Sequence, residues 1–265
     1  MTTRKECFSV AGISKPFRIL HISDVHFSSS TSHEKNQILI TEILKTVDFC
    51  TQPDLNLIAV TGDLVSRTLG ETSISDALDL LHKLRRIAPV AYSLGNHELD
   101  LSENLISEFL RKCRNLGVFV LNNSSVFIQD IMFTGLTLPR EVYKNQNGSY
   151  HNLTPVTEKL ILSCIGACVS KPCVLLAHSP MGFEAYAKWG ANIILSGHVH
   201  GGIIRMPIIN GILSPERKFF PKYTKGVYQS EFYKNCYMNV SAGIGKFRVN
   251  NPSEIICIDF MPVKV

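Results

Sequence analysis

Five short segments of this sequence carry side chains that bind divalent metal ions. They contain aspartate, histidine or asparagine, and they read Asp24-Val25-His26, Gly62-Asp63, Gly95-Asn96-His97, His178-Ser179 and Gly197-His198-Val199-His200. Nitrogen and oxygen ligands without thiolate suit manganese, iron or zinc better than a closed structural zinc site. A carboxylate can bind one metal through each oxygen, which offsets the repulsion between two neighbouring cations. The segments together therefore predict a pair of divalent metals.

Each segment directly follows or ends a short apolar run that predicts a buried strand. These runs cover residues 18–24, 55–61, 90–94, 173–177 and 192–195. Any one segment alone is a weak signal, since Gly-Asp is a common turn and Asp-x-His a common capping pair. In open α/β sheets, however, ligands bind beyond the carboxyl ends of the strands. Five strand ends in this order predict one metal-binding edge.

The elements between these runs complete an α/β pattern. Amphipathic helices are expected at 34–49, 73–86 and 102–116, which gives a β-α-β-α-β-α order and a mainly parallel sheet. Further along the chain we expect strands at 118–121, 125–129 and 131–136, a polar insertion at 138–154, helices at 156–169 and 183–189, a hairpin of 227–233 and 236–240 that turns at Lys234-Asn235, and a final strand at 255–261. No linker or repeat interrupts the pattern, which predicts one domain over residues 1–265.

Composition limits the class of protein. The chain has 265 residues, of which 45% are apolar and 18% charged, as is typical of a folded soluble protein. No apolar run approaches the roughly 20 residues that span a bilayer, and residues 1–16 do not form a signal peptide. We therefore expect a cytoplasmic location. The eight cysteines form no Cys-x-x-Cys pair, so we expect reduced thiols and do not favour a zinc site at Cys164 and Cys168.

The net charge of +5 is unevenly placed. Eight basic and two acidic residues fall between positions 201 and 250, so this window alone carries +6. Such a window is either a solvated surface or a region that recognises an anionic substrate, and the sequence leaves both interpretations open. Arg67 and Arg205 are the candidate substrate-binding residues.

The series Asp24-x-His26, Gly62-Asp63, Gly95-Asn96-His97-Glu98, His178 and Gly197-His198-x-His200 resembles the calcineurin-like metallophosphoesterases, from about residue 19 to residue 202. The resemblance implies a metallo-dependent phosphatase-like fold, a four-layer α/β/β/α sandwich with two mixed sheets. It also implies two divalent metal ions (Mn, Fe or Zn) and a set of roles. Asp24, His26 and His200 would hold the first metal; Asn96, His178 and His198 would hold the second; Asp63 would bridge them; and His97 would act on the leaving group.

One position departs from the family pattern. Many members carry a second aspartate, three residues after the bridging one, that orients the histidine of the Asn-His pair. Here Ser66 stands in its place, so another group must orient His97 or the imidazole is less polarised. We interpret Glu98 as a residue that starts a helix rather than as a partner of the metal centre.

The predicted function is hydrolysis of a phosphodiester or phosphomonoester by a metal-bridging hydroxide, with His97 assisting the leaving group. The alternatives are a non-catalytic metal-binding scaffold on the same fold and a lipid-linked pyrophosphate hydrolase. A nuclease is less favoured, because the basic cluster is local rather than a broad groove. Residues 205–223 resemble a bacterial branch with some membrane-tethered members, which suggests a peripheral membrane contact. The expected partner is an anionic phosphate ester.

Overall fold

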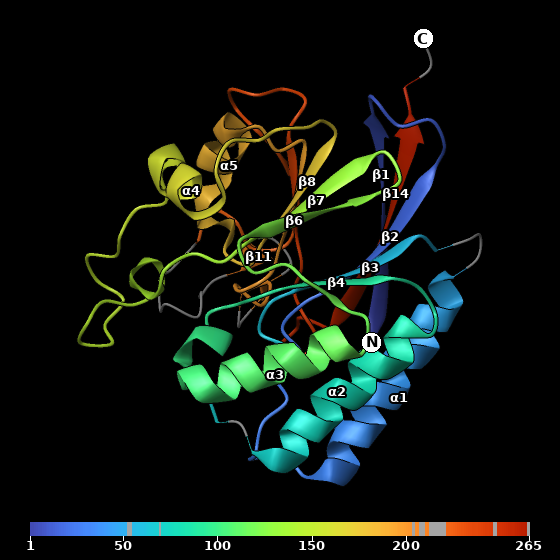
Figure 1. Ribbon diagram of the computed structural model, residues 1–265, viewed down its shortest axis with the longest axis vertical. Helices are drawn as coiled ribbons and strands as arrows, with labels where there is room; N and C mark the ends of the chain where they lie inside the picture. Colours follow the sequence, from blue (N-terminus) through green and yellow to red (C-terminus); the bar gives the residue numbers. More distant parts are fainter. Residues whose placement is uncertain are drawn as a thin grey trace.

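The computed structural model describes residues 1–51, 55–68, 70–202, 205–206, 210–211, 221–245 and 248–263 (Figure 1). Within these residues, two mixed six-stranded sheets account for most of the strands. The first sheet has the order β1 (Thr2–Val10), β14 (Glu254–Pro262), β2 (Phe17–Ile22), β3 (Leu57–Thr61), β4 (Val90–Ser93) and β5 (Phe119–Val120). Strands β2 to β5 are parallel, while β14 is antiparallel to β2 and parallel to β1.

The second sheet has the order β12 (Gly226–Gln229), β13 (Tyr237–Val240), β9 (Ile193–Ser196), β8 (Cys173–Ala177), β7 (Ile131–Leu136) and β6 (Ser124–Ile128). Its four central strands are parallel, and its two edge strands are antiparallel to their neighbours. A two-stranded ribbon of β10 (Arg205–Met206) and β11 (Asn210–Gly211) stands apart from both sheets.

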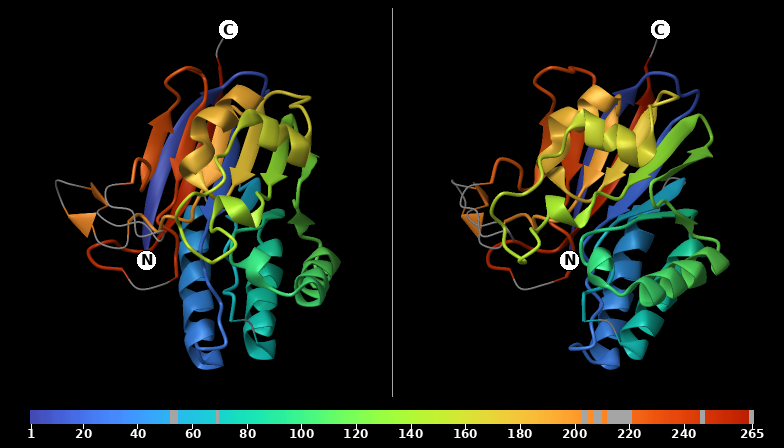
Figure 2. Two further views of the ribbon diagram at one scale, coloured as in Figure 1. Left: turned by 90° about the vertical axis from the view of Figure 1, so that its left-hand side faces the viewer. Right: turned by 60° about the vertical axis from the view of Figure 1, so that its left-hand side comes forward.

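Helices cover the outer face of each sheet, as Figures 1 and 2 show. Helices α1 (His33–Cys50), α2 (Glu71–Arg85) and α3 (Glu103–Asn115) pack on the first sheet, and α4 (Glu158–Ile165) and α5 (Phe183–Trp189) pack on the second. Three single turns of 3-10 helix complete the elements: η1 (Glu98–Asp100), η2 (Arg140–Val142) and η3 (Pro180–Gly182). The predicted four-layer α/β/β/α sandwich with two mixed sheets is confirmed.

The two-residue period of the strands divides their side chains between the layers. In β3, Ile58 and Val60 face the helices α1 to α3, while Leu57 and Ala59 face the second sheet. All five residues of β3 are buried, which is why this strand is recognisable as a continuous apolar run. The sheets are thereby fixed on both faces, and their strand ends become a rigid platform for the segments that follow.

Several expected elements differ from the structure. Strand β1 was not predicted, because Arg4, Lys5 and Glu6 interrupt its apolar pattern and only Phe8 and Val10 are buried in it. Helix α4 ends at Ile165 rather than at 169, since Gly166 follows it with φ +69°. Ile38, whose position in the amphipathic helix expected at 34–49 predicts a place on its apolar face, is 57% exposed in α1.

The expected tight turn at Lys234-Asn235 is a longer loop between Gln229 and Tyr237. The hydroxyl of Ser230 organises this loop, because its oxygen accepts hydrogen bonds from the backbone N–H groups of Phe232 and Tyr233. No helix in the described ranges is long and apolar enough to cross a membrane.

Candidate metal centre

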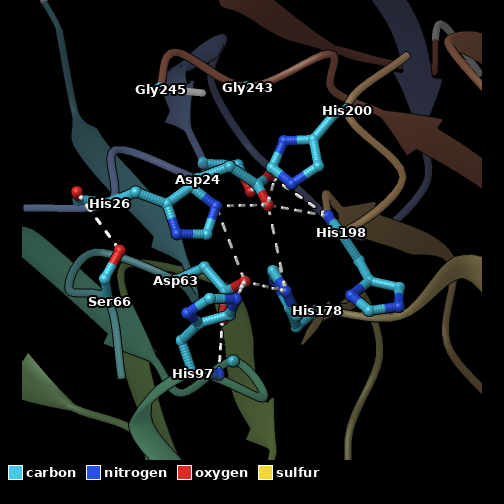
Figure 3. Close-up of polar contacts among 12 residues, drawn as sticks. Asp24, His26, Asp63, Ser66, His97, His178, His198, His200, Gly243 and Gly245 are labelled. Atoms are coloured by element: carbon cyan, nitrogen blue, oxygen red, sulfur yellow. Dashed lines mark hydrogen bonds and ion pairs between the residues drawn. The ribbon is translucent and has the colours of Figure 1, made fainter. Parts of the chain in front are cut away.

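The segments that follow β2, β3, β4, β8 and β9 converge on one buried cluster (Figure 3). Asp24 and His26 follow β2, Asp63 follows β3, His97 follows β4, His178 follows β8, and His198 and His200 follow β9. Ligand atoms of these residues fall into three overlapping groups, each within 4.8 Å: Asp24, His26 and His200; His26, Asp63 and His97; and Asp63, His178 and His198. The structure therefore brings together seven of the eight predicted side chains. The eighth, Asn96, is half-buried and precedes His97 in the same turn.

Two carboxylate oxygens form the middle of the cluster. Asp24 Oδ1 lies 3.8 Å from His26 Nε2, 3.8 Å from His200 Nδ1 and 3.9 Å from His178 Nε2. Asp63 Oδ2 lies 3.7 Å from His26 Nε2, 3.8 Å from His97 Nε2 and 3.3 Å from His178 Nε2. His26 and His178 thus each face both carboxylates. The Oδ2 atom of Asp63 faces histidines from three different segments, those that follow β2, β4 and β8.

The shortest of these separations, 3.3 Å between Asp63 Oδ2 and His178 Nε2, suits two ligands of a shared cation, and the other five are slightly longer. Two donors that each lie roughly 2.1 Å from one metal, at tetrahedral or octahedral angles, are about 3 to 3.5 Å apart. His178 Nδ1 bonds the carbonyl oxygen of Thr61 at 2.8 Å, which leaves Nε2 directed at the carboxylates, as in a metal-binding histidine. Among the described residues, no hydrogen-bond partner satisfies the buried Asn96 Oδ1. The residues present therefore fit divalent metal ions.

Five of these residues have a left-handed backbone that side chains other than glycine seldom adopt. The φ angles are 54° at Asp24, 60° at His26, 49° at Asp63, 70° at His198 and 51° at His200. Such conformations cost of order 1–3 kcal/mol each and persist where the surrounding structure imposes them. Here each one turns the chain sharply after a strand, so that the side chain points into the cluster.

Gly62 makes one of these turns possible. Its φ is +74°, and a Cβ atom at this position would lie 2.6 Å from the Cα atom of Gly95 and 2.7 Å from His178 Nδ1. Any larger residue would push the β3 and β4 turns apart. The glycine before Asp63 is therefore required by close approach as well as by its backbone angle.

The electrostatics of the centre are those of buried opposite charges. Burial alone would raise the pKa of Asp63, but the neighbouring imidazoles, above all His178, hold it well below its usual value. Burial would likewise lower the pKa of His178, yet the carboxylates of Asp63 and Asp24 raise it to about 10. A metal at this histidine must displace a proton, so metal affinity is expected to increase with pH.

Glu98 begins η1, as the sequence predicted, but it is also a partner of the centre, which the sequence interpretation did not favour. Its buried carboxylate accepts hydrogen bonds from the backbone N–H groups of Asp63 (2.9 Å), Val65 (3.1 Å) and Gly95 (2.8 Å). Burial and the negative charge of Asp63 raise the pKa of Glu98 to about 7. This one side chain ties the turn after β3 to the turn after β4.

A backbone amide contacts His97 in place of the missing aspartate. The N–H of Arg67 donates a hydrogen bond to His97 Nδ1 at 3.2 Å, so the proton of the neutral imidazole is on Nε2, which faces Asp63. The hydroxyl of Ser66 instead donates to the carbonyl oxygen of His26 at 3.4 Å. With serine at position 66, the ring of His97 is therefore held at Nδ1 by the backbone N–H of Arg67.

The C-terminal part of the chain supplies further support that the sequence did not indicate. The N–H of Gly245 donates to the carbonyl oxygen of Asp24 at 2.7 Å, and Asn251 Nδ2 donates to the carbonyl oxygens of His200 and Gly202. Arg248 donates to the carbonyl oxygens of Ala242 and Gly243. Backbone contacts of this kind leave no motif, so only the fold reveals them.

The polar insertion also reaches the centre. Tyr143 is buried, and its ring centroid lies 5.2 Å from that of His198 and 6.4 Å from that of His178. Arg67, a candidate substrate contact, is on the rim with its side chain 52% exposed. Arg205 is in β10, but its side chain lies outside the described part of the structure, as do Arg217 and Lys218 of the basic window. Cysteine is absent from the candidate metal groups of the described residues.

Comparison with known proteins agrees with this geometry. The family model for the calcineurin-like phosphoesterase matches residues 17–202. An uncharacterised metallophosphoesterase of Campylobacter jejuni is 25% identical over 255 residues, covering 94% of this chain and 60% of that protein. This chain therefore spans about three fifths of that relative. The phosphodiesterase YaeI of Escherichia coli is 25% identical over 258 residues, covering 93% of this chain and 83% of that protein.

A solved structure shares the fold. The crystal structure of the protein TT1561 of Thermus thermophilus has a TM-score of 0.51 and 13% identity, covering 86% of this chain and 89% of that one. This likeness shows the fold alone. The family match, which covers most of the sequence, carries the identification. This chain belongs to the calcineurin-like phosphoesterase family and is by class a phosphoester hydrolase.

Proposed function

We propose that this protein is a phosphoesterase with two divalent metal ions that hydrolyses phosphodiesters or phosphomonoesters, with His97 assisting the leaving group. The observation that carries the proposal is the position of Asp63 Oδ2, which lies 3.7 Å from His26 Nε2 and 3.3 Å from His178 Nε2. One oxygen can therefore serve both halves of a metal pair. The other oxygen, Oδ1, accepts the N–H of His97 at 2.8 Å. The two metals would therefore share Oδ2 rather than bind one oxygen each.

The remaining donors divide into two sets in this proposal. The first metal would be held by Asp24, His26 and His200, and the second by Asn96, His178 and His198. When bound, the two ions (Mn, Fe or Zn) supply a nucleophile derived from water for in-line attack and neutralise charge on the phosphoryl oxygens. Burial of the ligands keeps bulk water away, which strengthens these electrostatic interactions.

His97 is the proposed aid to the departing group. Because the N–H of Arg67 occupies Nδ1, the Nε2–H of the neutral imidazole can donate a hydrogen bond to the leaving oxygen and stabilise the negative charge that develops there. A positioned donor of this kind contributes roughly 10²–10⁴ in rate.

The scaffold alternative is disfavoured because all eight predicted positions are filled, including His97, which a scaffold does not need. The proposed partner is an anionic phosphate ester. A nucleic acid is not favoured, since the basic window is local. A peripheral membrane contact and a cytoplasmic location stay predictions from the sequence.

The test combines metal analysis with Mn²⁺-dependent assays on bis-p-nitrophenyl phosphate and p-nitrophenyl phosphate. We expect His97→Ala to keep both metals and to lower kcat about 10²- to 10⁴-fold. His82→Ala, at an exposed position on α2, is the matched control and should retain the wild-type rate. Wild-type protein that binds two metals and turns over neither ester would instead establish the scaffold.

A further inference from the structure

A group of three cations surrounds one carboxylate beside His97. Asp100, the last residue of η1, has a side chain that is only 6% exposed. Its Oδ2 lies 2.5 Å from Lys144 Nζ and 3.9 Å from Arg67 Nε, and its Oδ1 lies 3.1 Å from Arg140 Nε. We call these four residues the Asp100 cluster. They come from three separate segments that the fold brings to one place.

The cluster carries more positive charge than its carboxylate neutralises. Three cations and one anion leave a formal charge of +2. Lys144 is 13% exposed and serves the buried carboxylate, whereas the side chains of Arg67 and Arg140 are 52% and 56% exposed. A guanidinium has five N–H donors, and the contact of Arg140 with Asp100 uses only its Nε. The cluster therefore presents two guanidinium groups to solvent from a fixed anchor.

The cluster is linked to His97, the residue proposed to assist the leaving group. The N–H of Arg67 donates to His97 Nδ1, and the N–H of Asp100 donates to the carbonyl oxygen of His97 at 3.2 Å. Tyr143, which precedes Lys144, packs on His198 and His178. Arg67 thus contacts His97 through its backbone. Arg140 lies three residues before Tyr143, which contacts His198 and His178.

We propose that the Asp100 cluster binds a second phosphate on the leaving-group side of the scissile bond, so that the preferred substrates are diphosphate-linked esters. This inference rests on the proposed function. Guanidinium groups match phosphate oxygens in a bidentate way, and the charge of +2 would balance a leaving phosphate. Isolated ion pairs at a surface contribute little to stability, so charge neutralisation alone does not account for three cations on one carboxylate.

The reaction follows directly. Water supplies the new oxygen on the first phosphorus, and the bond from that phosphorus to the bridging oxygen breaks. The bridging oxygen leaves with its electron pair on the second phosphate. The two protons of water are distributed between the two phosphate monoester products, and no oxidant or reductant is needed.

The experiment compares two substrates with the same aryl group. Bis-p-nitrophenyl phosphate has one phosphate, and the symmetrical bis(p-nitrophenyl) diphosphate has two, its cleavage being followed by chromatography of p-nitrophenyl phosphate. We expect Arg140→Gln to lower the ratio of kcat/KM for the diphosphate to that for the diester about tenfold, equivalent to about 1.4 kcal/mol. The change should occur mainly in KM for the diphosphate. Arg140→Lys should show a smaller fall in the ratio than Arg140→Gln.

Arg67→Gln gives a second arm. It retains the backbone N–H that holds His97, so we expect the same fall in the ratio. The control is Lys188→Gln, which removes a surface lysine paired with Glu158 on the α4–α5 layer and should leave the ratio unchanged. Both arginines are half exposed, so these variants should fold, which circular dichroism can verify.

A binding measurement separates this proposal from the proposed function. The methylene-bridged analogue of the diphosphate cannot be hydrolysed, and its Kd on the metal-loaded protein can be measured by calorimetry. We expect Arg140→Gln to raise that Kd about tenfold. An unchanged Kd and an unchanged substrate ratio would overturn the cluster as a phosphate site and leave it a surface ion-pair network, even if the diester is hydrolysed normally. Failure of the wild type to hydrolyse either ester would count against the proposed function, whatever the Kd.

Discussion

The two halves of the candidate centre are supported in different ways. In the proposed assignment, the first half consists of Asp24, His26 and His200, and the second of Asn96, His178 and His198. The first half is supported by residues 241–245 and 248–251, beyond the family match that ends at residue 202: Gly245 bonds Asp24, and Asn251 bonds His200 and Gly202. Figure 3 shows Gly243 and Gly245 close to Asp24.

The second half is supported from within the matched region. The carbonyl oxygen of Thr61 holds the ring of His178, Glu98 ties the β3 turn to the β4 turn, and Tyr143 covers the imidazoles. The matched region thus supplies the contacts described for the second half. The first half also has contacts from that region, since the N–H of His26 donates to the carbonyl oxygen of Asp63 at 2.9 Å, but it receives additional ones from residues beyond residue 202.

The largest effect is expected where the two halves join. Asp63→Asn removes the charge of the shared carboxylate, so metal binding in both halves should weaken and kcat should fall at least about 10³-fold. Metal content by mass spectrometry and turnover of bis-p-nitrophenyl phosphate measure this. The exposed Asp48→Asn is the control. If Asp63→Asn retained two tightly bound metals, the two halves would not share that residue.

Gly243→Ala should affect the first half alone. Gly243 has φ +71°, and a Cβ atom there would lie 2.6 Å from the Cβ of Asp24. We expect the loss of one metal and a decrease of about 1–3 kcal/mol in the free energy of unfolding. Gly148→Ala is a matched control, because Gly148 has φ +73° but nothing within 4 Å of its added Cβ. Equal behaviour of the two variants would show that the contact with Asp24 is unimportant.

Glu98→Gln should affect the second half. The carboxamide keeps the shape of Glu98 but replaces one oxygen by an NH2 group. That group faces either the N–H of Val65 or those of Asp63 and Gly95, which leaves at least one buried donor unsatisfied. We expect a loss of about 1–3 kcal/mol in stability and weaker binding of one metal in a calorimetric titration. The exposed Glu103→Gln on α3 should change neither quantity. Selective loss of the metal from the first half would show that Glu98 supports that half instead.

The last prediction concerns the pH dependence of stability. Burial lowers the pKa of His21 to about 3, from an ordinary value near 6.5, and its Nε2 bonds Thr61 Oγ1 at 2.7 Å. The native state therefore keeps His21 neutral while the unfolded state takes up a proton below pH 6.5. Its contribution to stability is present above pH 6.5 and is lost as the pH falls from 6.5 towards 3.

By linkage, His21 should account for about 2 kcal/mol of the stability lost between pH 7 and pH 5. Urea unfolding of the metal-free protein at the two pH values, compared between the wild type and His21→Gln, measures this share. The variant should lose correspondingly less stability on acidification. Parallel losses in the two proteins would show that His21 is protonated in the native state.

The sequence predicted those parts that depend on local pattern. Continuous apolar runs such as residues 57–61 identified the central strands, and the polar residues just after them are the ones that converge. Strand β1 was missed because its charged residues hide an edge strand that pairs only with β14, more than 240 residues away. The direction of the Glu98 side chain was missed because its partners are backbone amides of another loop.

The same limit applies to His97 and to the first half of the centre. The replacement of the expected aspartate by a backbone N–H at Arg67 has no signature in residue types, since every residue other than proline carries that donor. The support given by Gly245 and Asn251 joins segments that are far apart in the chain. Such contacts follow from the packing of the sheets and not from any spacing in the sequence.

The most direct test is electron paramagnetic resonance of the protein loaded with Mn²⁺, together with a metal count. A shared Asp63 predicts two manganese ions for each chain and the spectrum of a spin-coupled pair. Asp63→Asn should abolish that coupling. A single manganese ion for each chain, with the six-line spectrum of an isolated ion at saturation, would contradict the proposal that the two halves form one dinuclear centre.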